Sequence, residues 1–182
     1  EHDALADAWN ACVRFAAVAH RTQLFPGTTM PYLVHVVTVA NEVLLGMLDS
    51  PHHERLLAMR CALLHDVLED TEPPVADIAH TFGVEVAMGV RALSKDPQLP
   101  KDQQMEDSLA RIQNQPRAIW CVKLADRIAN LGVPPTYWRP SKIASYQTEA
   151  RKIHAALAPA SDALAKRLER RIEAYSAFLT AP

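Results

Sequence analysis

Residues 63–71 read Leu63-Leu64-His65-Asp66-Val67-Leu68-Glu69-Asp70-Thr71, and the interpretation of the whole chain begins with this stretch. It continues an apolar run with helical spacing and brings four ionisable side chains to the end of that run. Burying such groups costs several kcal/mol unless they are paired or bound to a metal. On a continuous helix, His65 and Glu69 lie one turn apart, as do Asp66 and Asp70. The pattern therefore predicts an imidazole and three carboxylates at one helix end.

Two interpretations of this stretch stay open on its residues alone. In the first, the side chains bind a divalent metal, because imidazole and carboxylate suit Mn, Fe or Zn and hard oxygen ligands favour Mn or Mg. In the second, the stretch is a polar helix end exposed to water, where His65 offsets the negative end of the helix dipole.

Two further apolar stretches favour the metal interpretation. Residues 32–37 place His35 among Tyr, Leu and Val, and residues 122–131 place Asp126 in a similar setting. Alone, such a histidine is more often a hydrogen-bonded core residue, and such an aspartate is usually paired with a neighbouring Lys or Arg. Taken together, four residues on three predicted helices form one candidate ligand set: His35, His65, Asp66 and Asp126.

Composition and proline placement predict an all-α fold in one domain that covers residues 1–182. The chain has 49% hydrophobic residues, 22% charged residues, 5 Gly and 13 Pro, which suits helices joined by proline-marked corners better than a sheet with glycine-rich turns. The expected helices cover about residues 3–20, 31–49, 51–70, 75–82, 84–93, 101–113, 116–131, 141–157 and 161–179.

Several classes of protein are disfavoured by charge and patterning. A net charge of −2 argues against nucleic acid as a partner, and no apolar run reaches the ~18 residues of a membrane span. The 3 Cys form no C-x-x-C motif, which favours buried free thiols and a cytoplasmic location. The mixed charges of residues 166–173 are interpreted as a solvated helix face. The first residue is not Met, so loss of an N-terminal segment stays open.

Four stretches resemble the HD superfamily of metal-dependent phosphohydrolases. The similarity is closer to the hydrolase domain of the RelA/SpoT group and to its single-domain relatives, the small alarmone hydrolases of the Mesh1 type. The matching residues are 19–23 with 31–35, 62–71, 82–83 and 122–131. These motifs fall within about residues 15–150, and the helices beyond them complete the expected HD-domain helical bundle.

The resemblance implies a metal site and a water-activating pair. It implies that His35, His65, Asp66 and Asp126 hold the metal, usually Mn²⁺, although another divalent metal stays open. Glu69 and Asp70 are then expected to orient a water molecule or accept its proton. Five residues are expected to contact the substrate: Asn130 at the sugar, Lys142 and Tyr146 at the phosphates, Phe25 by stacking on the base, and Lys95 as a further phosphate-binding cation.

The implied function is metal-dependent hydrolysis of the 3′-pyrophosphate of a nucleotide alarmone, of the (p)ppGpp or (pp)pApp type, with release of pyrophosphate. The chain departs from the family pattern at Leu24-Phe25-Pro26, where basic residues are usual, and at Val36, Val133 and Lys142. These departures favour a changed substrate within the class. The alternatives are another HD-type nucleotide phosphohydrolase and a non-catalytic module that binds a nucleotide. The expected partner is a small-molecule nucleotide, and homo-oligomerisation stays open.

Overall fold

The computed structural model describes residues 2–70 and 74–179, apart from the side chains of His2 and Asp70. The predicted helix break at residues 71–73 lies outside these ranges. The helices are α1 (His2–Ala19), α2 (Leu33–Gly46), α3 (His52–Leu64), α4 (Val67–Asp70), α5 (Val75–Phe82), α6 (Val84–Leu93), α7 (Gln104–Gln113), α8 (Arg117–Asn130), α9 (Pro140–Leu157) and α10 (Asp162–Tyr175), with 3-10 turns at Ala158–Ala160 and Ser176–Phe178. The described ranges contain no strand, only an isolated bridge between Leu24 and Pro31, so the all-α prediction is confirmed.

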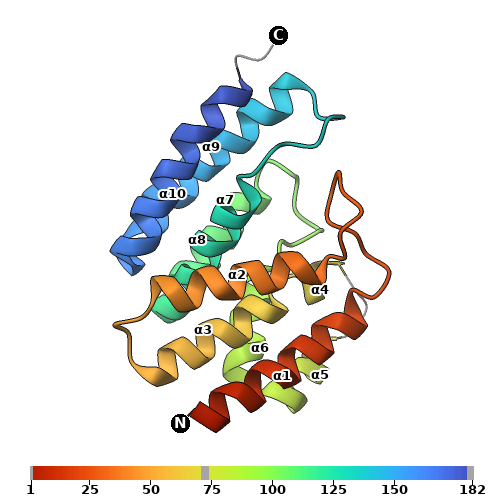
Figure 1. Cartoon of the computed structure of the whole chain (residues 1–182), viewed down its shortest axis with the longest axis vertical. Helices are drawn as coiled ribbons and strands as arrows, with labels where there is room; N and C mark the ends of the chain where they lie inside the picture. Colours follow the sequence, from red (N-terminus) through yellow and green to blue (C-terminus); the bar gives the residue numbers. More distant parts are fainter. Residues whose placement is uncertain (1, 71–73, 180–182) are drawn as a thin grey trace.

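Helix α8 is the element around which the others pack. It contacts α2, α3, α7, α9 and α10. Figure 1 shows α9 and α10 side by side at one end of the molecule and α1, α2 and α3 grouped towards the other end, with α8 between them. The sequence explains this position, because ten of its residues, from Ala118 to Ile128 with the exception of Trp120, are buried. A helix that is buried on all sides needs a neighbour on every face.

The third predicted helix, expected over residues 51–70, is interrupted at His65 and Asp66. Helix α3 ends at Leu64, and α4 begins at Val67, so residues 65 and 66 form a turn between them. The amide of Glu69 donates to the carbonyl of Asp66 over three residues, at 3.2 Å, instead of continuing the four-residue helical ladder. The expectation of one unbroken helix through Asp70 was therefore wrong, although His65 itself keeps helical dihedral angles, with φ −58° and ψ −34°.

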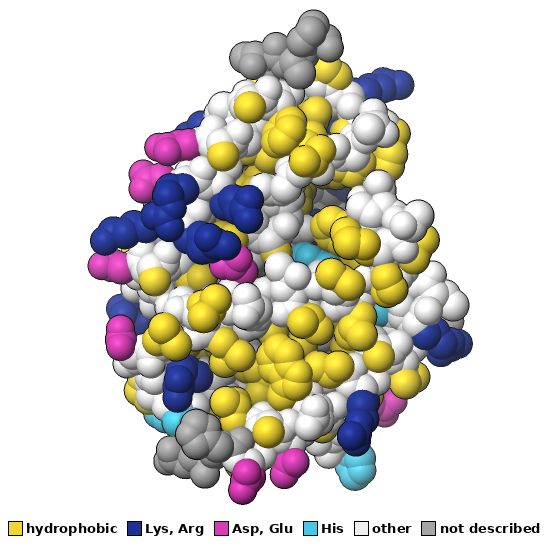
Figure 2. Space-filling model, in the orientation of Figure 1, with side chains coloured by type: hydrophobic (Ala, Val, Ile, Leu, Met, Phe, Trp, Pro, Cys, Tyr) yellow, Lys and Arg dark blue, Asp and Glu magenta, His cyan; other side chains and the backbone are white. Residues whose placement is uncertain are grey.

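Several smaller features complete the fold. Ser161 caps α10, because its side chain accepts a hydrogen bond from the amide of Leu164. The three cysteines are buried and free. In the described part of the chain, no helix is both long and apolar enough to cross a membrane. Figure 2 shows basic side chains gathered over α10, where Lys166, Arg170 and Arg171 are exposed, as expected of a solvated helix face.

A partly buried ion pair joins α2 to α10. Both guanidinium nitrogens Nε and Nη2 of Arg167 donate to the carboxylate of Glu42, each at 2.5 Å. The Glu42 side chain is 9% exposed and that of Arg167 is 43% exposed. The pair closes the contact between the two helices that flank α8, and its bidentate geometry fixes their register.

We expect Arg167→Met to leave the Glu42 carboxylate buried without its partner. Because water reaches one side of the pair, the free energy of unfolding should fall by about 1–2 kcal/mol, less than for a fully buried pair. Chemical denaturation measures this change, and Lys166→Met on the exposed face of the same helix is the matched control. Equal stability of the two variants would contradict the prediction.

Candidate metal centre and active site

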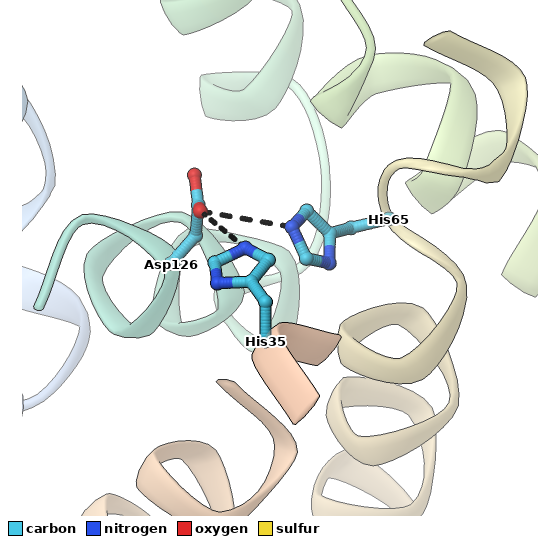
Figure 3. Close-up of side chains that lie close together, drawn as sticks. All are labelled: His35, His65 and Asp126. Atoms are coloured by element: carbon cyan, nitrogen blue, oxygen red, sulfur yellow. Dashed lines mark ion pairs between the residues drawn. The ribbon is translucent and has the colours of Figure 1, made fainter. Parts of the chain in front are cut away.

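Three buried side chains from separate elements converge on one point. His35 comes from α2, His65 from the turn after α3, and Asp126 from the middle of α8 (Figure 3). Their ligand atoms all lie within 4.8 Å of one another. Asp126 Oδ1 lies 3.4 Å from His35 Nε2 and 3.6 Å from His65 Nε2. Ligand atoms on opposite sides of one ion are separated by about 4.3 Å, so the group has the size that a single metal ion requires.

The tautomer of His65 is set by the end of α3. Its Nδ1 lies 2.8 Å from the carbonyl oxygen of Ala62, which can only accept, so Nδ1 carries the proton. The lone pair of a neutral ring is then on Nε2, which points to Asp126 and Asp66. A backbone carbonyl behind a histidine ring is the usual arrangement of a metal-ligating imidazole.

The Nε2 atoms of His35 and His65 are both buried and lack a hydrogen-bond partner of acceptable geometry, although carboxylate oxygens lie within 4 Å of each. A buried polar atom without a partner costs about 1–3 kcal/mol, so two together need an explanation. A divalent cation satisfies both nitrogens and the facing carboxylate at once. The residues present therefore fit a metal ion.

Asp66 lies at the edge of this group and is held by Tyr32. Its Oδ2 is 2.9 Å from His65 Nε2 and 3.7 Å from His35 Nε2, and it accepts a hydrogen bond of 2.5 Å from the Tyr32 hydroxyl. The Tyr32 ring lies against the rings of His20 and His35, with centroids 4.9 and 5.2 Å away. The fourth predicted ligand thus lies within reach, with its carboxylate oriented by an aromatic side chain.

Asp126 is held from its own helix. Lys123 Nζ donates to Oδ2 at 3.0 Å, and Asn130 Nδ2 donates to Oδ1 at 2.6 Å. Spacings of three and four residues place both donors on the same face of α8 as the carboxylate. One turn of helix on each side therefore fixes how Asp126 faces the two imidazoles.

The charges of the group are strongly coupled. Burial raises the pKa of Asp126, but Lys123 and the two imidazoles outweigh burial and hold that pKa well below its ordinary value. Burial raises the pKa of Asp66 as well, and His65 outweighs it to bring this pKa to about 2. For His65, burial lowers the pKa, whereas the Asp66 and Asp126 carboxylates raise it well above its ordinary value. Without a metal, Lys123 and the two imidazoles offset the charge of the carboxylates.

A polar cavity of about 160 Å³ opens beside the metal group. Three carboxylates, Asp66, Glu69 and Asp126, line this cavity together with three cations, which are Lys95, Lys123 and Arg127. Its remaining lining residues are Tyr32, Asn130 and Tyr146. A small cavity with a metal group at its base and three cations in its walls suits a polyanion such as a phosphate chain.

A second cavity of about 320 Å³ has no charged side chain among its lining residues, and it shares Asn130 and Tyr146 with the polar one. Its walls are the loop that contains Phe25 and the segment from Gly132 to Trp138. Gly27 brings these walls together: its φ is 77°, and an added Cβ would lie 2.9 Å from Pro135 Cβ. The two cavities together offer an apolar site for a flat ring and a charged site for its phosphates.

The structure brings most of the predicted site residues to the metal group and the two cavities. The four expected metal ligands lie together, and Glu69, Lys95, Asn130 and Tyr146 line the polar cavity. Phe25 lines the apolar cavity and stacks on His35, with centroids 5.4 Å apart. Lys142 is exposed and lines neither cavity, and its Nζ lies 5.4 Å from the Trp138 ring and 5.8 Å from the Tyr146 ring. The Asp70 side chain lies outside the described residues.

Three contributors to the site were missed by reasoning from the sequence, and one of them is Lys123, which donates to Asp126 and lines the polar cavity. Arg127 follows Asp126 directly, yet it lies over the Tyr146 ring at 4.1 Å and lines the polar cavity. Tyr32 reaches Asp66 across 34 positions of sequence. The spacing of Tyr32 and His35 on one helix side was the available signal, but no local pattern predicts a contact of this length.

We expect divalent metal to stabilise the protein more at about pH 8 than at about pH 6. The raised pKa of His65 means that a proton competes with metal for Nε2, so affinity falls as pH falls through that pKa. Thermal denaturation with and without MnCl2 at the two pH values measures the effect. His65→Ala should remove the metal-dependent shift at both, and His154→Ala on α9 is the control. A shift of equal size at both pH values would contradict the prediction.

Comparisons with known proteins agree with this geometry. The HD domain family model matches residues 11–163. The guanosine-3′,5′-bis(diphosphate) 3′-pyrophosphohydrolase MESH1 of Drosophila melanogaster is 31% identical over 148 residues, which cover 78% of this chain and 80% of that protein. The guanosine-3′,5′-bis(diphosphate) 3′-pyrophosphohydrolase of Aquifex aeolicus is 36% identical over 138 residues, which cover 72% of this chain and 18% of that protein.

A solved structure described as a metazoan orthologue of SpoT that hydrolyses ppGpp is similar over nearly the whole chain. Its TM-score is 0.80 at 26% sequence identity, with 92% of this chain and 94% of that chain covered. Residues 11–163, which the HD domain family model matches, contain the whole candidate metal group and every lining residue of the two cavities except Tyr175. With its helical architecture, its group of His35, His65 and Asp126, and this family match, the chain belongs to the HD domain family.

Proposed function

We propose that the chain is an Mn²⁺-dependent phosphohydrolase that removes the 3′-pyrophosphate of a nucleotide alarmone, of the (p)ppGpp or (pp)pApp type. The observation that carries the proposal is a pair of cavities that share Asn130 and Tyr146, one apolar and the other lined by the candidate metal ligands Asp66 and Asp126, which offer separate sites for a base and for a charged phosphate chain. The names of the relatives support the substrate class, because those from Drosophila and Aquifex are both guanosine-3′,5′-bis(diphosphate) 3′-pyrophosphohydrolases.

The metal is held by His35, His65, Asp126 and Asp66 in this proposal. Two imidazoles with two carboxylates suit a divalent transition metal, and the oxygen ligands favour Mn²⁺. When bound, such an ion lowers the pKa of a coordinated water and polarises a phosphoryl oxygen.

The side chains of the polar cavity divide the remaining work. Glu69 accepts the proton of the attacking water, since its carboxylate faces the cavity one helical turn beyond Asp66. The water oxygen bonds to the phosphorus that is attached to the 3′ oxygen. The bond between this phosphorus and the 3′ oxygen breaks, pyrophosphate leaves, and the 3′ oxygen takes a proton. Lys95, Lys123 and Arg127 bind the leaving pyrophosphate oxygens. Asn130 joins the two cavities and contacts the sugar.

The apolar cavity takes the nucleobase. Phe25, Trp138 and Tyr146 are aromatic, and any base offers a face to stack on them. Since no charged side chain lines this cavity, the base is held by stacking and shape more than by charge. Guanosine and adenosine alarmones are therefore both substrates in this proposal, and Lys142 near the rim contributes to the phosphates by long-range attraction alone.

A non-catalytic nucleotide-binding module is the second candidate. Glu69 argues against it, because a site that only binds phosphates gains nothing from a carboxylate that faces them and repels them. The proposed setting is cytoplasmic, with a small-molecule nucleotide as the partner and neither nucleic acid nor membrane involved.

Purified protein with MnCl2 should release pyrophosphate from ppGpp or pppApp. Glu69→Ala should lower kcat by ~100-fold or more, in the range of a lost general base, while the metal-dependent thermal shift stays. Coupled pyrophosphate detection and thermal denaturation measure the two effects. Release of phosphate without pyrophosphate would contradict the alarmone substrate, and no turnover of either nucleotide would contradict the enzyme.

Phe25→Ala should separate base binding from chemistry. Removing one stacking ring costs about 1–3 kcal/mol of binding, so KM should rise by ~5- to 100-fold for both ppGpp and pppApp, with kcat changed less. Because Phe25 also stacks on His35, retention of the metal-dependent thermal shift is checked in the same sample. An increase in KM for one base only would show that the cavity reads base identity.

A further inference from the structure

The carboxylate of Glu69 is oriented by the backbone of a distant loop. The amide nitrogen of Lys95, just after α6, donates to Glu69 Oε2 at 3.1 Å. The Lys95 ammonium is farther away, with Nζ 3.9 Å from Oε1. The backbone amide is therefore the closer partner, and its direction sets where the carboxylate points.

The same peptide group is held on its other side by Arg111 of α7. Arg111 Nη2 donates to the carbonyl of Ser94 at 2.8 Å. The carbonyl of Ser94 and the amide of Lys95 belong to one trans peptide plane, so they point in opposite directions. A guanidinium fixed on the carbonyl side determines how the amide on the far side is aimed at Glu69. The cation also polarises the peptide and strengthens its amide as a donor.

Arg111 is itself fixed by several bonds. Its Nη1 donates to the carbonyls of Arg91 at 2.7 Å and Ala92 at 3.1 Å, so it caps the last turn of α6. On its own helix, Asp107 Oδ2 accepts from Nε and lies 2.8 Å from both Nε and Nη2. A lysine has a single point charge and cannot reproduce this planar set of donors. Ser94 is 3% exposed, whereas the hydrogen bond from the Lys95 amide to Glu69 is exposed, so the held peptide runs from the protein interior to the surface of the site.

We propose that Arg111 is a positioning residue for the reaction, acting through the Ser94–Lys95 peptide to hold the Glu69 carboxylate in its reactive direction. The inference rests on the proposed function, in which Glu69 accepts the proton of the attacking water. Arg111 touches neither of the cavity linings described above. Its effect is on the rate of chemistry and not on substrate binding.

Three variants test the role. Arg111→Met removes the donors and keeps the apolar stem, and Arg111→Lys keeps the charge without the fork. Lys152→Met is the matched control, since it breaks a neighbouring ion pair between α9 and Glu106 of α7 without touching the end of α6. Amounts are normalised to the folded fraction from circular dichroism, so a loss of stability does not count as a loss of rate.

Arg111→Met should lower kcat by ~10- to 100-fold with KM changed by less than ~3-fold, as expected for a displaced reacting group. The kcat of Arg111→Lys should lie between that of Arg111→Met and that of the wild type, and the kcat of Lys152→Met should equal the wild-type value. The metal-dependent thermal shift should be the same in all four proteins. Equal kcat in Arg111→Met and Lys152→Met, or a rise in KM that accounts for the whole loss, would overturn the proposal.

Amide hydrogen exchange gives a readout that needs no turnover. In metal-free protein, the Lys95 amide should exchange at least ~10-fold faster in Arg111→Met than in Lys152→Met, because the peptide that carries this amide is no longer held in line with Glu69. Unchanged exchange would overturn the proposal even if activity falls. A wild-type protein that hydrolyses neither ppGpp nor pppApp would instead contradict the proposed function, and the Lys95 exchange rates would still decide whether Arg111 holds this peptide.

Discussion

A carboxylate buried in the middle of a helix is the constraint on which the rest of this structure depends. Asp126 lies in the most enclosed helix of the described chain, where an isolated charge would be very costly. Lys123 and Asn130 satisfy part of its requirement from α8 itself. The rest comes from His35 and His65, so α2 and the end of α3 must pack against this one face of α8. The contacts that pack α2 and the end of α3 against α8 therefore also assemble the metal group.

The turn at residues 65–66 shows what this constraint costs locally. A regular helix through residue 70 would keep its backbone ladder intact, yet α3 stops at Leu64 and resumes as α4 at Val67. At this turn the His65 ring has its Nδ1 on the Ala62 carbonyl and its Nε2 beside the Asp66 carboxylate. Glu69, in the short helix that follows, lines the polar cavity with Lys95. A proposed ligand thus lies in the break between α3 and α4, and the proposed proton acceptor lies in α4.

The site is divided by polarity in a way that matches a nucleotide. Charged groups line one cavity and apolar or aromatic groups line the other, and Asn130 and Tyr146 belong to both. The three cations of the polar cavity are matched by three carboxylates, so in a chain with a net charge of −2 a polyanion is favoured there once a divalent metal offsets Asp66 and Asp126. Support for the polar cavity extends as far as α7, where Arg111 holds the peptide that orients Glu69.

The sequence by itself determined the helical class, most helix positions and the four residues that meet at the metal group, because helix periodicity, proline corners and ionisable side chains in apolar runs are local signals. It also indicated Glu69, Asn130 and Tyr146 through a family resemblance. Only the tertiary structure decided that α3 breaks before Val67, that Tyr32 and Arg127 join the site, and that Lys142 stays outside it. These outcomes depend on contacts between residues far apart in the chain, such as the hydrogen bond from Tyr32 to Asp66. A buried carboxylate needs such a partner, and local sequence preferences do not show which distant side chain provides it.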